Sequence, residues 1–181
     1  MDIRTRLTGG NVVFRKNIDR ALILKVATKA EPMVAILSCS DCRVDPEKIF
    51  NLSIGDAYVV RIAGNSASEQ AVLGSLEYAV ETLQVPALLV LGHTGCGAVK
   101  AAIEGKAPEG LVRVAHDIDL ARHRLSGYHV NSADAVAEEN VRLQMRQIAG
   151  NSQTIRDAMA SGRLAVLGAM YDLTTGSVRL L

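Results

Sequence analysis

Short apolar runs alternate with amphipathic stretches along most of the chain. Four of the apolar runs have the length of strands: 33–37, 57–62, 87–91 and 164–171. Runs that are apolar on both faces are typical of the buried strands of a parallel sheet. A turn at 174–176 then leads into a shorter fifth strand at 177–181.

The stretches between these strands repeat their apolar residues at the period of a helix. Within 66–83, for example, Val72, Leu76 and Leu83 fall on one apolar stripe. This pattern predicts helices over the following segments: 1–30, 66–83, 98–103, 133–149 and about 152–161. Pro32 stops the first segment, and Gly150 is expected to end the helix over 133–149.

Residues 104–132 show no clear period and are predicted to be irregular. They hold Pro108, several glycines and three of the four histidines. We expect His116, His123 and His129 to lie in solvent.

Strands that alternate with helices indicate an α/β fold with a mainly parallel central sheet flanked by helices. No change in composition marks a second domain. We therefore expect a single domain over 1–181, with an N-terminal helical arm at 1–30 and a core at 33–181.

Composition excludes several classes of protein. The chain has 181 residues, of which 49% are apolar, and its 20 basic residues nearly balance its 19 acidic ones, so intrinsic disorder is excluded. The charge balance, 3% aromatic residues and no Trp argue against nucleic-acid binding. No apolar run is long enough to span a membrane. Three cysteines are too few for a disulfide scaffold, and the N-terminus lacks an apolar signal segment, so a cytoplasmic protein is expected.

All three cysteines come shortly after predicted strands. Cys39 and Cys42 follow the run at 33–37, and His93 and Cys96 follow the run at 87–91. In an open parallel sheet, sites form at the carboxyl ends of the strands. Thiolate and imidazole ligands favour Zn²⁺ over hard cations.

The spacing leaves two kinds of zinc site open. If the chain stays extended after residue 37, Cys39 points away from Cys42, and Cys39, His93 and Cys96 form a catalytic set of three ligands with an open fourth position. Alternatively, Cys42 completes a closed, structural Cys₃His site. Against it, no glycine flanks the pair, and Arg43 would stand beside the site without a task. A redox-active Cys39–Cys42 pair would leave His93 and Cys96 without a role.

Asp41 and Arg43 are predicted to form a pair next to these thiols. A bidentate guanidinium fixes a carboxylate and keeps it ionised. A held Asp41 can orient a zinc-bound hydroxide, whereas a released Asp41 can take the fourth coordination position. The alternative is a surface ion pair of little consequence.

These motifs resemble those of the β-class carbonic anhydrases. That family has a Cys-x-Asp-Ser-Arg motif and a His-x-x-Cys-Gly motif, which here are the segments 39–43 and 93–97. The resemblance extends to further segments: 60–65, 74–80, 97–101 and 168–173. Cys42 stands where the family usually has Ser.

The resemblance implies Zn²⁺ on Cys39, His93 and Cys96, with Asp41 and Arg43 as a catalytic dyad. It implies reversible hydration of CO₂ to bicarbonate and a proton by zinc-bound hydroxide. It also implies a homodimer or dimer of dimers, in which the N-terminal helix reaches over the partner. A CS₂ or COS hydrolase on the same scaffold, or a non-catalytic protein with a structural zinc, remains an alternative.

Gly97 and Arg61 are two further residues with predicted roles. The N–H of Gly97 opens a helix and can meet a bicarbonate oxygen, although the turn alone also explains a glycine there. Arg61 is expected to be a structural or interface charge.

Overall fold

The computed structural model describes residues 2–125 and 132–181, and it contains a five-stranded sheet. The strands are β1 (Val34–Ser38), β2 (Ala57–Arg61), β3 (Ala87–His93), β4 (Ala165–Tyr171) and β5 (Val178–Leu180). Their order is β2-β1-β3-β4-β5, with all neighbours parallel except the antiparallel pair β4 and β5. The predicted α/β fold with a mainly parallel sheet is confirmed.

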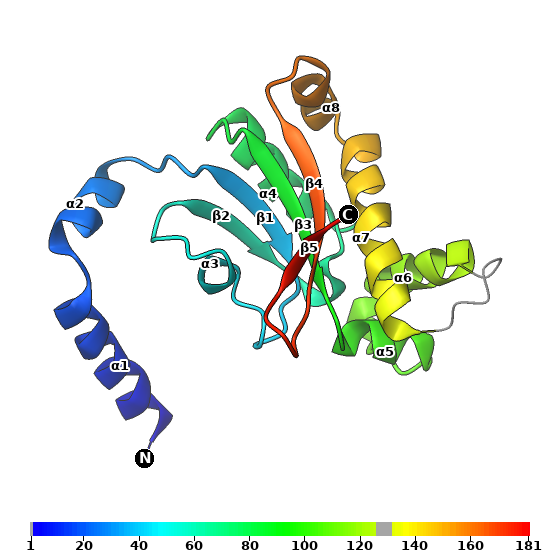
Figure 1. Ribbon diagram of the computed structural model, residues 1–181, viewed down its shortest axis with the longest axis horizontal. Helices are drawn as coiled ribbons and strands as arrows, with labels where there is room; N and C mark the ends of the chain where they lie inside the picture. Colours follow the sequence, from blue (N-terminus) through cyan, green and yellow to red (C-terminus); the bar gives the residue numbers. More distant parts are fainter. Residues whose placement is uncertain (1, 126–131) are drawn as a thin grey trace.

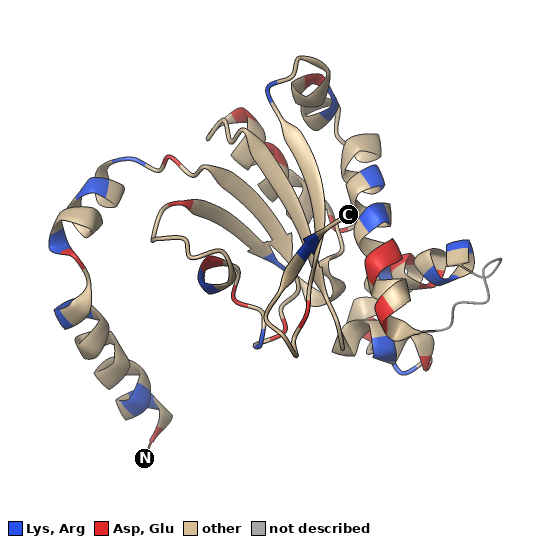
Figure 2. Cartoon of the chain, viewed as in Figure 1, with Lys and Arg blue, Asp and Glu red and all other residues tan. Residues whose placement is uncertain are grey.

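Eight α-helices and two short 3₁₀ helices occur in the described residues. They are α1 (Ile3–Asn17), α2 (Arg20–Thr28), α3 (Pro46–Ile49), η1 (Ala63–Asn65), α4 (Gln70–Glu81), α5 (Gly97–Ile103), η2 (Glu109–Leu111), α6 (Val112–Leu125), α7 (Ala133–Asn151) and α8 (Gln153–Ala160). Lys, Arg, Asp and Glu lie mostly on the helices and loops (Figure 2). None of the helices in the described residues is long and apolar enough to cross a membrane.

Side chains that alternate along the strands build a core on each face of the sheet. Leu37 and Val90 belong to the larger core, which α4, α6 and α7 cover, whereas Ile36 and Leu91 belong to a smaller core beside α3. Helix α7 runs along the sheet (Figure 1). It lies so close to β3 that a Cβ at Gly92 would be 2.5 Å from a methyl carbon of Val141.

Several expectations about the bounds and nature of the elements were wrong. Residues 112–125, predicted to be irregular, form α6, because Val114, Ile118 and Ala121 recur at helical spacing and are buried. Helix α7 continues through Gly150 to Asn151, and the turn comes at Ser152, whose side chain accepts the Ile155 N–H to cap α8. Strand β3 extends to His93, two residues beyond the predicted end.

Two of the three histidines predicted to lie in solvent are in the described residues, and both are exposed as expected. His116 is exposed on α6. His123 is exposed, and its Nδ1 lies 2.8 Å from the Asp119 carbonyl oxygen. His129 lies outside the described residues.

The N-terminal arm, which we define as residues 3–28, extends away from the sheet (Figure 1). It is two helices rather than one, because the backbone is extended at Ile18 and Asp19, and Asp19 caps α2 by accepting the Ala21 N–H at 2.8 Å. No residue of either helix is buried. Its large exposed apolar side chains are Ile3, Leu7, Val12, Val13, Phe14 and Leu24.

Candidate metal centre

The carboxyl ends of the neighbouring strands β1 and β3 bring two thiols and one imidazole together. Cys39 follows β1, His93 ends β3, and Cys96 is the N-cap residue of α5. All three are buried, and one ligand atom from each lies within 4.8 Å of the others. The two Sγ atoms are 3.9 Å apart. We call Cys39, His93 and Cys96 the ligand cluster.

The hydrogen bonding of His93 leaves one ring nitrogen available to a metal. Its Nδ1 lies 2.9 Å from the Thr94 carbonyl oxygen, which can only accept, so Nδ1 carries the proton. Its Nε2 is buried and has no hydrogen-bond partner among the described residues. A buried nitrogen without a partner, beside two sulfur atoms, fits a soft divalent cation such as Zn²⁺.

The pKa values of the two thiols of the cluster are shifted in opposite directions. The hydrogen bond with Cys96 lowers the pKa of Cys39, whereas that same contact and burial raise the pKa of Cys96. Burial disfavours a charged His93, but the neighbouring Cys39 thiolate outweighs it and raises the pKa of His93. One negative charge is therefore favoured on Cys39. A bound divalent cation deprotonates coordinating thiols outright and would stabilise both as thiolates.

Asp41 and Arg43 form a bidentate pair next to the cluster. Arg43 Nε and Nη2 donate to the two carboxylate oxygens at 2.9 and 2.6 Å. The hydrogen bonds from the Arg43 side chain and backbone hold the pKa of Asp41 well below its usual range. The Asp41 side chain is only 14% exposed, against 56% for Arg43, so the carboxylate is fixed at the edge of the buried cluster.

The chain at this point is a turn, and the expected extended backbone was wrong. The Asp41 carboxylate accepts the Arg43 N–H at 3.0 Å, and the Asp41 carbonyl accepts the Val44 N–H at the same distance. An Asp side chain that accepts the N–H two residues on stabilises such a turn. Cys42 lies in it, exposed and outside the ligand cluster. The four-ligand Cys₃His arrangement and the Cys39–Cys42 pair are therefore not what the fold assembles.

Arg61 holds this loop from the neighbouring strand. It ends β2, and its Nε and Nη2 donate to the carbonyl oxygens of Cys39 and Asp41 at 3.2 and 2.7 Å. This is a structural role of the kind expected for Arg61.

A buried polar network that the sequence did not indicate supports the other side of Cys39. The Gly64 N–H hydrogen-bonds to Cys39 and helps to lower its pKa. Gly64 has a φ of +64°, and its carbonyl accepts from Asn140 of α7 at 2.8 Å. Asn140 in turn accepts from Gln144, which also donates to the buried Asp117. These residues are far apart in the sequence, and only the packing of α6 and α7 brings them to the site.

Comparison with known proteins identifies the family. The family model for carbonic anhydrase matches residues 34–178. Carbonic anhydrase of Mycolicibacterium smegmatis is 40% identical over 91% of this chain and 81% of its own length. Carbonic anhydrase 2 of Mycobacterium tuberculosis is 38% identical over 83% and 75% of the two chains.

Solved structures agree with the sequence relatives. The β-carbonic anhydrase CcaA has a TM-score of 0.87 and 27% identity, over 98% of this chain and 86% of its own. Coccomyxa β-carbonic anhydrase in complex with acetazolamide has a TM-score of 0.82 and 30% identity, over 99% and 84%. These named relatives are all carbonic anhydrases, which favours CO₂ over CS₂ or COS as substrate and an enzyme over a structural zinc protein. The chain therefore belongs to the β class of the carbonic anhydrase family and catalyses the reversible hydration of CO₂ to bicarbonate and a proton.

Proposed function

We propose that CO₂ hydration takes place at the ligand cluster, with Zn²⁺ held by Cys39, His93 and Cys96. The observation that carries the proposal is the convergence of these three buried side chains within 4.8 Å. When bound, Zn²⁺ lowers the pKa of a coordinated water to about 7 and so supplies a nucleophile for CO₂. Two thiolates leave more negative charge at the site than three imidazoles would, so activity is expected to favour alkaline pH.

Asp41 and Arg43 form the catalytic dyad of this proposal. Asp41 accepts a hydrogen bond from the attacking oxygen and thereby orients it toward the carbon of CO₂. Arg43 keeps the carboxylate ionised and in place through its two side-chain hydrogen bonds. For Asp41 to become a fourth metal ligand, in a closed state of the enzyme, it would first have to leave Arg43.

Gly97 is the proposed contact for the product. It is the first residue of α5, directly after Cys96, and it is exposed. Its backbone N–H can donate to an oxygen of bicarbonate, and the proton released in the hydration passes to buffer.

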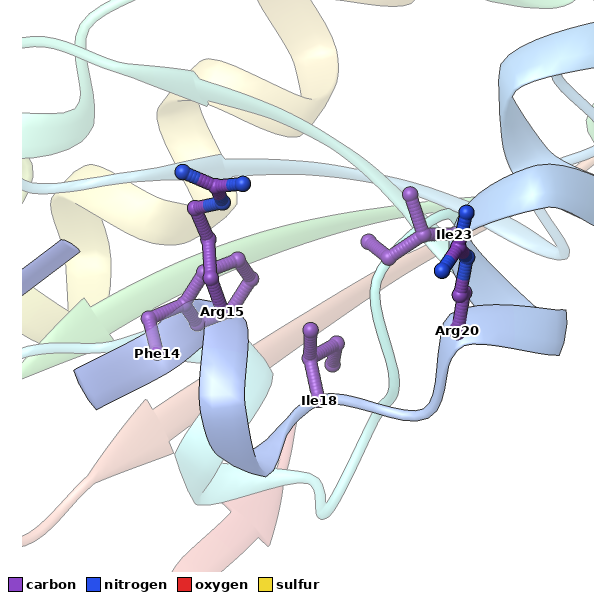
Figure 3. Close-up of a pocket in the computed structure, with 5 residues that line it drawn as sticks. All are labelled: Phe14, Arg15, Ile18, Arg20 and Ile23. Atoms are coloured by element: carbon purple, nitrogen blue, oxygen red, sulfur yellow. The ribbon is translucent and has the colours of Figure 1, made fainter. Parts of the chain in front are cut away.

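We also propose that the chain works as a homodimer, or as a dimer of dimers, in the cytoplasm. Phe14, Ile18 and Ile23 line a hollow where α1 meets α2, together with two arginines (Figure 3). Because the arm buries none of its own apolar residues, a second copy of the chain is the proposed cover. A reducing compartment suits three free cysteines, of which two must be thiolates to bind metal.

The direct test is to remove and restore the metal. The purified protein should contain about one zinc per chain. A chelator should abolish CO₂ hydration in a stopped-flow assay, and added Zn²⁺ should restore it. Cys96→Ser should neither hold zinc nor recover activity. Full zinc content in Cys96→Ser would contradict the ligand set, and hydration by a protein shown to be free of zinc would contradict the proposal as a whole.

A further inference from the structure

The loop that joins His93 to Cys96 is held by groups that belong to other parts of the fold. The Thr94 N–H donates to the Tyr171 carbonyl at the end of β4, and the Leu173 N–H donates to the Thr94 hydroxyl, both at 3.0 Å. Thr94 is thereby fixed to the sheet. The next residue, Gly95, makes the turn that brings the chain back to Cys96.

Gly95 has a φ of +63°, in the left-handed region that glycine adopts readily. Its N–H donates to the Asp134 carboxylate at 2.7 Å, and its carbonyl accepts from Arg43 at 3.4 Å. Glycine is also the residue with the most conformational freedom to lose. A turn built on glycine therefore keeps one geometry only if other groups hold its backbone, and here Asp134 and Arg43 do so.

Asp134 does not cap its own helix, so its carboxylate can bind the loop between His93 and Cys96. It lies in the first turn of α7, where a carboxylate interacts favourably with the helix dipole. The N-cap is Ser132, whose hydroxyl accepts the Ala135 N–H at 3.1 Å. The Oδ1 atom of Asp134 instead points to Gly95, 39 residues earlier in the chain.

We infer that Asp134 is a positioning residue, which fixes the turn at Gly95 so that His93 and Cys96 converge on one metal ion. This inference rests on the proposed zinc ligands. Through Gly95 the same carboxylate is linked to Arg43 and so to Asp41, which connects the start of α7 to both the ligand cluster and the dyad. Partners that orient metal ligands from outside the coordination sphere typically change metal affinity by about 10- to 100-fold when they are removed.

The test is the rate at which zinc leaves the protein, measured with a chromogenic chelator in excess. Asp134→Ala should release zinc about 10-fold faster than the wild type or more. Asp134→Asn keeps an oxygen that can accept the Gly95 N–H, so it should stay close to the wild type. The matched control is Ser132→Ala. It removes the cap of the same helix turn but keeps the hydrogen bond between the Gly95 N–H and the Asp134 carboxylate.

A second measurement follows the geometry directly. With Co²⁺ in place of Zn²⁺, the visible absorption bands report how the ligands surround the ion. Asp134→Ala should change these bands, while Asp134→Asn and Ser132→Ala should not.

The possible outcomes distinguish a failure of the role of Asp134 from a failure of the proposed zinc ligands. Fast release in Asp134→Ala alone supports the role of Asp134. Equally fast release from Asp134→Ala and Ser132→Ala overturns it, because fraying of α7 would then explain the loss of zinc. An unchanged release rate in Asp134→Ala also overturns it. A wild-type protein that binds no zinc would overturn the proposed ligand set, and this inference with it.

Discussion

The ligand cluster and the N-terminal arm are both rich in apolar or soft side chains, but the chain buries the cluster and leaves the arm exposed. Cys39, His93 and Cys96 are each at most 4% exposed. In the arm, by contrast, Leu7 is 66% exposed and Phe14 43%. The cluster lies where two adjacent parallel strands end, so the sheet places Cys39 and His93 side by side. No residue of the arm is buried by the chain itself, and a second copy is its proposed cover.

We therefore expect metal binding to depend on the ligand cluster, and the association of chains to depend on the arm. Changes in the cluster should alter metal content and activity and leave the association of chains intact. Changes in the arm should alter association and leave metal binding intact.

The largest effect is expected for His93→Ala. It removes the only nitrogen ligand of the cluster, so zinc should be lost and CO₂ hydration should fall to the rate of buffer alone. Elemental analysis and stopped-flow hydration measure the two losses. Light scattering after size exclusion should show the same oligomer as the wild type, and a monomer would argue against the separation of the two regions.

How much of this centre the sequence could predict depends on how local the signal is. Cys39 and His93 lie at strand ends, and strand ends can be located from short apolar runs. The turn at Asp41–Val44 was missed because the Asp41 carboxylate, not the periodicity, makes it. Helix α6 was missed because charged residues interrupt its stripe of Val114 and Ile118.

The supports from α7 could not be predicted from the sequence at all. Asn140 and Asp134 bind backbone groups of Gly64 and Gly95, which precede them by 76 and 39 residues. Nothing local distinguishes either from an ordinary polar helix residue, because each acts through a backbone group of a distant glycine. Such contacts follow from how α7 packs on β3 and β4, which the hydrophobic pattern does not specify.

The next largest effect is expected for Asp41→Asn. The amide has nearly the shape of the carboxylate, but it carries no charge and accepts more weakly, so zinc should stay while hydration falls by about 100-fold or more. Stopped-flow measurement at saturating zinc tests this. Arg43→Lys is the companion variant, since it keeps the charge and loses the bidentate geometry. Its rate of hydration should lie between those of the wild type and Asp41→Asn. Wild-type turnover in Asp41→Asn would remove the dyad from the mechanism.

A change of association without loss of metal is expected for Leu7→Asp in the arm. Ile3, Leu7 and Phe14 recur at helical spacing along α1, so a charge at Leu7 falls within an apolar stripe. The apparent mass should drop toward that of one chain, and zinc per chain should be unchanged. Thr5→Asp puts the same charge on the opposite side of α1 and should leave the mass as it is. If both variants kept the wild-type mass, the arm would not be an interface.

The smallest effect is expected for Cys42→Ser, which tests whether the ligand cluster is complete with three residues. Cys42 is exposed in the turn after β1, and it is not among the three side chains that converge. An exposed substitution of this size should change the free energy of unfolding by no more than about 0.5 kcal/mol. Zinc affinity and CO₂ hydration should match the wild type. A structural Cys₃His site predicts the opposite, because binding energy for such a metal is folding energy and one of four ligands would be lost. Zinc titration and thermal unfolding of Cys42→Ser beside Cys39→Ser distinguish the two, since only Cys39→Ser should lose the metal.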